Sequence, residues 1–150
     1  MYDTRIRPKV IPERCLYIPA PAKNEQIQSF LHHLAIRNFF AWVLDRSLVG
    51  LPNLGGALVS LLYSMNEFRF KDVDNISDLK EYMDREGYLA MKNSPDHALA
   101  VLYFSEHFRL KDLWLDAFAH CVGMHDRLGS SPEYQVSCSV WFDAHRLMSF

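Results

Sequence analysis

The chain has 150 residues, 49% of them hydrophobic and 23% charged, with a formal net charge of −2. A chain of this length is enough for one domain and buries about 70% of its unfolded surface, so it needs neither disulfides nor metal ions to form a core. The composition excludes disordered and low-complexity classes. The sequence pI near 6.4 also argues against a general nucleic-acid-binding protein.

The cysteines and the apolar runs predict the compartment. Cys15, Cys121 and Cys138 are odd in number and scattered, which favours a reducing, intracellular setting over a disulfide framework. The N-terminus lacks the apolar core of a signal peptide. No window reaches the roughly 18 apolar residues that span a membrane, and the longest candidate is Leu54–Met65. We therefore expect a cytoplasmic protein with no membrane span.

Residues 1–23 differ in composition from the rest of the chain. They hold four of the seven prolines, and five cations against two carboxylates. Proline disfavours a regular helix, so we expect an extended, basic, proline-containing arm. Such an arm can contact anionic partners. Because it has so few cations, we interpret it as a solvated or docked arm rather than as a nucleic-acid-binding arm. Residues 24–150 are expected to form one helical domain.

The first half of that domain carries two apolar stripes with helical spacing. Asn24 is a candidate N-cap for the first helix. Residues 38–44 are then apolar nearly all round, which predicts a central helix buried on several sides. Gly50–Gly56 resembles a phosphate loop only superficially and is interpreted as an interhelical turn. A second stripe follows along Leu54–Met65.

The second half carries clearer start and stop signals. A shorter helix is expected from Asn75 to Gly87, and Ser94-Pro95-Asp96 begins the next. Leu110–Gly123 is the best amphipathic segment, and Ser131-Pro132-Glu133 begins a final helix. The uncapped end at Phe150 predicts a chain cut from a longer protein, although a natural helical C-terminus fits equally well.

These elements predict an all-α fold, a compact bundle of about six helices with the extended N-terminal arm. Three tryptophans, ten phenylalanines and seven tyrosines exceed what a small helical core requires. Aromatic residues dominate the centres of protein interfaces, so this surplus favours contact with another protein. The expected core consists of Trp42, Leu58, Leu61, Leu102, Trp114, Phe118 and Trp141.

The chain offers little catalytic patterning. No Cys-x-x-Cys or His-Glu-x-x-His spacing occurs, so we expect no metal ion and no cofactor. Cys121 beside His120 is interpreted as a buried core cysteine rather than a nucleophile. The alternative to an interaction module is a small-ligand binder or enzyme with an interhelical pocket around His120, His125 and Asp126.

Two resemblances bear on function. The segments Leu16–Pro21, Arg37–Trp42, Pro95–Ala100 and Leu113–Met124 resemble a helical domain of unknown function from large, partly disordered proteins of filamentous fungi. That resemblance implies part of a longer protein and transfers no catalytic residue. Val101–Ala119 also resembles the closing helical hairpin of BTB/POZ domains, which mediate dimerisation and adaptor binding.

Together these observations predict a protein–protein interaction or scaffold module within a larger cytosolic protein. It would not be an enzyme, and its partner would be a protein, including a second copy of itself. The prediction requires an exposed apolar patch or an aromatic groove on the folded domain.

Overall fold

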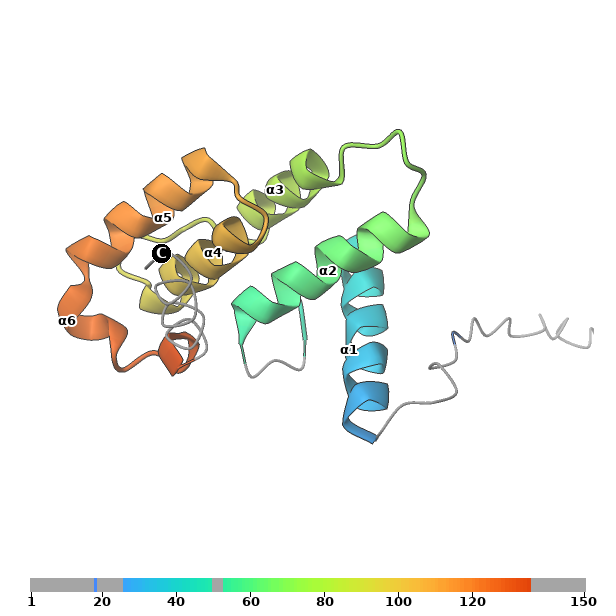
Figure 1. Ribbon diagram of the computed structural model, residues 1–150, viewed down its shortest axis with the longest axis horizontal. Coiled ribbons are helices and arrows are strands. Elements are labelled where there is room, and N and C mark those ends of the chain that lie inside the picture. The colour runs from blue at the N-terminus through green and yellow to red at the C-terminus, as the bar shows by residue number, and fades with distance from the viewer. Residues whose placement is uncertain (1–17, 19–25, 50–52, 136–150) are drawn as a thin grey trace, which may run out of the picture.

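The computed structural model describes residue 18 and residues 26–49 and 53–135. These residues form helices and no strand, which confirms the all-α prediction. In chain order the helices are α1 (Gln26–Val43), α2 (Leu54–Phe68), α3 (Asn75–Arg85), α4 (Pro95–His107), α5 (Lys111–Gly123) and α6 (His125–Leu128) (Figure 1). Residues 132–135 are helical as well. None of the helices described is long and apolar enough to cross a membrane.

Several predictions fall on residues outside this description. The expected arm, apart from Ile18, and the candidate N-cap Asn24 lie outside the described residues. The same holds for Cys15, Cys138 and Trp141.

The helix starts follow local capping chemistry. Ser94 accepts a hydrogen bond from the His97 amide at 3.4 Å, and Pro95 takes the first turn of α4, as predicted. α3 begins at Asn75, as predicted, and its cap is Asp74, whose carboxylate accepts the Ser77 amide at 3.0 Å. Gly87 follows α3 with φ of +77°, a conformation that favours glycine.

Gly55 and Gly56, predicted to lie in a turn between helices, are helical instead. They lie inside the first turn of α2. The cap is Asn53, whose side chain accepts the Gly56 amide at 2.6 Å. A strong cap therefore starts the helix ahead of the two glycines despite their low helix propensity.

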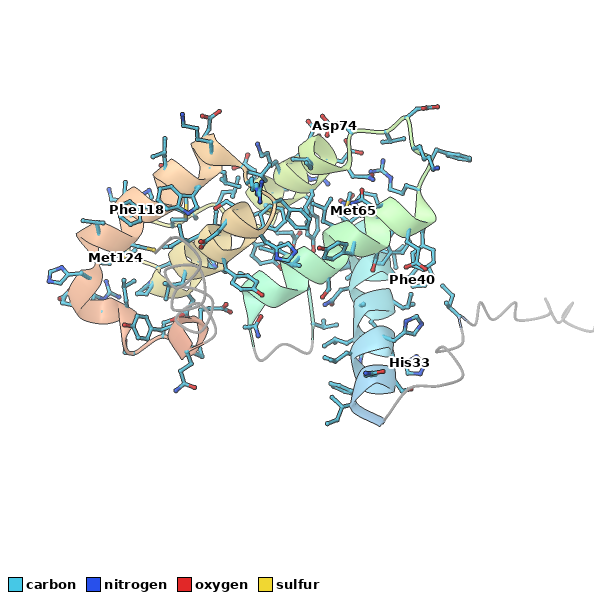
Figure 2. All side chains as sticks on the ribbon, in the orientation of Figure 1. His33, Phe40, Met65, Asp74, Phe118 and Met124 are labelled. Atoms are coloured by element: carbon cyan, nitrogen blue, oxygen red, sulfur yellow. The ribbon has the colours of Figure 1, made fainter. Side chains whose placement is uncertain are left out.

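The core lies between α2 and α4. Leu58 and Leu61 on α2 are fully buried and Leu102 on α4 is nearly so, which confirms these three core predictions. Figure 2 shows side chains of both helices filling the space between them, with Met65 among them. The remaining described members of the expected core, Trp42, Trp114 and Phe118, are partly buried and pack against its edge.

The prediction that residues 38–44 form a buried central helix is wrong. α1 packs chiefly on α2 and extends away from the other helices (Figure 1). Leu34 and Asn38 are buried on the side that faces α2, whereas Val43 and Leu44 are exposed. α4 occupies the centre instead, because its small residues Ala98 and Ala100 let other helices approach on several sides.

The chain after α1 is fastened to α3 and to the turn that follows it. The buried Tyr82 hydroxyl donates to the Arg46 carbonyl at 2.6 Å, and the Leu48 amide donates to the Tyr88 hydroxyl at 2.9 Å. Burial raises the pKa of Tyr82 above its ordinary value, which favours the protonated phenol that donates this hydrogen bond. On the opposite side, the Val49 amide donates to Asn38 at 3.0 Å.

The N-terminus of α2 is held from two directions. A Cβ atom on Gly55 would lie 3.2 Å from the Ala100 carbonyl oxygen, so glycine permits a close approach of α2 to α4. The carboxylate of Glu133, which is buried, accepts the amides of Leu54 and Gly55. Two otherwise unpaired amides at the positive end of α2 thus find their acceptor 79 positions along the chain.

Glu133 is itself positioned by α4. The Ser131 hydroxyl donates to Asp96 at 2.5 Å and accepts the Glu133 amide at 3.2 Å. The segment that begins at Ser131 therefore bridges the N-terminal ends of α2 and α4. Burial raises the pKa of the Glu133 carboxyl above 4.5, although the two amides act in the opposite direction.

This raised pKa predicts a pH dependence of stability. The unfolded chain ionises Glu133 near pH 4.5 and the folded chain only at higher pH. The stability that Glu133 contributes is therefore fully present below pH 4.5 and is lost as the pH rises through its folded pKa. Glu133→Gln keeps an acceptor oxygen but does not titrate.

We expect the free energy of unfolding of the wild type, measured relative to Glu133→Gln by urea titration, to fall as the pH rises above 4.5. A difference that is constant with pH, or that rises, would contradict this placement of the carboxylate.

Candidate functional site

The structure places the residues singled out in the sequence on the neighbouring helices α5 and α6. The His120 imidazole lies 3.9 Å from the Asp116 carboxylate on α5, while His125 and Asp126 are exposed on the four-residue helix α6. Three hollows lined by described residues lie elsewhere and include none of His120, His125 and Asp126. Within the same part of the chain, no group of three or more histidines, cysteines and carboxylates could hold a metal ion. A ligand pocket around these residues stays a prediction.

Cys121 is a core residue, as predicted. Its side chain is buried on α5, and burial raises the pKa of the thiol to about 11. The reactive thiolate is therefore scarce at neutral pH, which is the opposite of what a catalytic cysteine requires.

A more promising site lies where α2 turns into α3. α2 ends at Phe68, because Arg69 adopts an extended conformation with φ of −103° and ψ of 162°. Asp74 then begins α3 by capping it. The connection of residues 69–74 projects at the end of the molecule away from α6 (Figure 1). Figure 2 shows the labelled Asp74 at the base of this connection.

A network of polar side chains fixes the connection from within. The Arg69 guanidinium donates to Asn75 at 2.5 Å and to Asp78 at 2.6 Å, and it lies 4.9 Å from the centre of the Trp42 ring. Asn75, which is buried, donates in turn to Asn66 at 2.7 Å. Arg69, at the end of α2, thus contacts both α1 and α3, because a guanidinium offers several donors in a fixed plane.

This network holds an aromatic ring out in solvent beside a hollow. Phe70 is 86% exposed, the highest value among the exposed large apolar side chains of the described residues. The hollow has a volume of about 400 Å³ and spans the C-terminal end of α2, the connection and the start of α3. Its lining residues are Leu62, Asn66, Phe70, Lys71, Val73, Asp74, Asn75, Ile76 and Phe108. We call Phe70, Val73 and Tyr63, together with this hollow, the corner patch.

The chemistry of the corner patch suits the burial of an apolar group. Leu62, Ile76 and Phe108 are apolar and belong to or pack against the core. Tyr63 stands next to Phe108 with ring centres 5.6 Å apart, and its exposed hydroxyl pairs with His107. The lining holds no histidine, cysteine or hydroxyl side chain that could act as a nucleophile. Its only charged members are Lys71 and Asp74.

The two other described hollows are less suited to a partner. One, near Trp42, has its charges already paired, since Arg85 lies 2.8 Å from Asp45 and Asp78 is bound by Arg69. The other, between α1 and α2, is smaller at about 180 Å³. The Asn38 side chain that lines it already accepts a hydrogen bond from the Val49 amide.

The sequence analysis missed the corner patch. The sequence signal for this patch is a pair of apolar residues in the connection between two helices, where polar residues are expected. Phe70 and Val73 interrupt a charged stretch there, and neither belongs to the apolar stripe of a neighbouring helix.

Comparison with known proteins gives one match over part of the chain. The profile of a family described as a domain of unknown function (DUF8004) matches residues 76–140. This match agrees with the predicted helical domain of unknown function and includes Ile76 and Phe108 of the corner patch, whereas Phe70 lies outside it. No curated protein and no solved structure matches the chain.

The burial of Cys121 predicts slow chemistry at that thiol. At pH 8 the native thiolate fraction is about one in a thousand for a pKa of about 11. Alkylation by iodoacetamide, followed by mass mapping of the Cys121 peptide, should proceed more than tenfold faster in urea than in the folded protein, as a rough expectation. Equal rates in the two states would show that the thiol is accessible.

The polar network predicts that Asn75 stabilises the connection. Asn75→Ala removes two hydrogen bonds, the one from Arg69 and the one to Asn66, while Arg69 keeps Asp78. At about 0.5–1.5 kcal/mol for each bond, we expect a loss of about 1–3 kcal/mol in the free energy of unfolding. Amide hydrogen exchange at Val73 should also accelerate. The control is Asp72→Ala in the same connection, an exposed side chain that should change stability by less than about 0.5 kcal/mol. Equal effects of the two substitutions would contradict the assignment.

Proposed function

We propose that this chain is a protein–protein interaction module and that the corner patch is its binding surface. The observation that carries the proposal is Phe70, an aromatic side chain left 86% exposed beside an apolar hollow on a connection fixed by hydrogen bonds. Exposed apolar groups that cluster around a concave surface are typical of interaction sites.

The energetics favour binding at this position. Full burial of a phenylalanine side chain contributes about 1.5–3 kcal/mol, and aromatic anchors account for much of the affinity of many interfaces. Arg69 and Asn75 already order the connection in the free protein. A partner therefore gains the burial of the ring without having to order the segment that bears it.

The same proposal places the module in the cytoplasm as part of a larger protein. Support comes from Cys121, a free buried thiol of the kind found in reducing compartments. It also comes from the resemblance to domains of large fungal proteins. The stretch that resembles the BTB/POZ hairpin, Val101–Ala119, covers the second half of α4 and most of α5, which is consistent with an adaptor role.

The proposal is tested by selecting a displayed random peptide library against the wild-type chain. We expect enriched peptides with an aromatic or aliphatic anchor whose affinity falls at least tenfold, about 1.4 kcal/mol, in Phe70→Asp. The matched control is Leu115→Asp, which changes a half-exposed apolar residue on α5 and should leave affinity unchanged.

Both variants must unfold at the same urea concentration as the wild type, because each changes an exposed side chain. Retained binding in Phe70→Asp, equal loss in Leu115→Asp, or failure to enrich any peptide would contradict the proposal.

A further inference from the structure

The corner patch carries a protrusion and a hollow on the same surface. Phe70 stands out from the rim, and Leu62, Ile76 and Phe108 line the space beside it. A two-fold symmetric interface requires this arrangement, because each copy must present both the group that inserts and the site that receives it.

We propose that the partner of the corner patch is a second copy of this chain. The two copies meet about a two-fold axis, and Phe70 of each enters the hollow of the other. This inference rests on the proposed function and specifies the partner.

The size of the hollow fits the inserted group. About 400 Å³ accommodates a phenyl ring together with its methylene group. Ile76 and Phe108 line the hollow and are partly exposed, so the ring would pack on them above the buried Leu62. Two-fold symmetry makes every contact twice, and both Phe70 rings leave water in one association step.

The charges on the rim are complementary to those of a second copy. Lys71 lies next to Phe70 and Asp74 next to Val73, and both line the hollow. A second copy can set the Lys71 ammonium of one rim against the Asp74 carboxylate of the other. Each copy thus offers one cation and one anion, which favours this pairing over a like-charged encounter.

The size of the corner patch determines how tightly the two copies are expected to associate. Stable dimers bury about 800 Å² per partner, and one connection with the adjoining ends of three helices offers less than that. We therefore expect a dimer that dissociates readily and becomes populated as concentration rises. Arg69 holds the connection in place beforehand, so association does not require refolding.

The first experiment measures the mass of the full chain by sedimentation equilibrium from about 10 µM to about 1 mM. The wild type should move from 17.5 kDa towards twice that mass as concentration rises. Phe70→Asp and Lys71→Glu should each raise the dissociation constant at least tenfold, and Leu115→Asp should not change it. A wild-type mass of 17.5 kDa over the whole range, or a Phe70→Asp variant that dimerises normally, overturns the inference.

The second experiment identifies the contact. In a mixture of isotope-labelled and unlabelled chains, filtered NOE spectra should show the Phe70 ring of one copy against the Leu62 and Ile76 methyl groups of the other. A dimer without these signals uses another face and also overturns the inference.

Failure of this inference can be separated from failure of the proposed function. A monomeric chain that still binds selected peptides through Phe70 keeps the interaction module and replaces the second copy with a different protein partner. A chain in which Phe70→Asp alters neither self-association nor peptide binding refutes both.

Discussion

The close contact between the start of α2 and the middle of α4 is the constraint on which the rest of the structure depends. Gly55 brings the α2 backbone near the Ala100 carbonyl, and Glu133 accepts the first amides of the same helix. Because α2 is fixed at this end, its core residues face α4 and its last turn has a defined position. The place of the corner patch at the far end of α2 follows from this packing.

At the far end of α2, polar contacts rather than core packing order the connection to α3. Arg69 joins Asn75, Asp78 and Trp42, so the connection between α2 and α3 keeps its shape without burying its apolar side chains. Phe70 remains in solvent as a consequence. A fold that ordered this segment by burying Phe70 in its own core would leave no comparable surface exposed. Here Arg69 and Asn75 order the segment, and Phe70 stays at the surface.

The sequence predicted the parts of the structure that depend on local chemistry. Ser94 and Pro95 start α4 as expected, and the stripe containing Leu58 and Leu61 is buried, because capping and helical periodicity act within a few residues. The prediction of a central position for residues 38–44 was wrong, because burial depends on which other helices pack against a segment. α4 occupies the centre instead. The Glu133 contact joins residues 79 positions apart, and the Arg69 hydrogen bonds link the end of α2 to α3, so the pattern within one helix predicts neither.

The central claim is that the connection bearing Phe70 is rigid in the free protein and presents its ring to a partner. Backbone ¹⁵N relaxation of the full chain below its association range tests this directly. The account predicts order parameters of about 0.85 for residues 69–75, equal to those of α2 and α3. Values below about 0.6 at Phe70 and its neighbours would show a flexible loop and contradict the account.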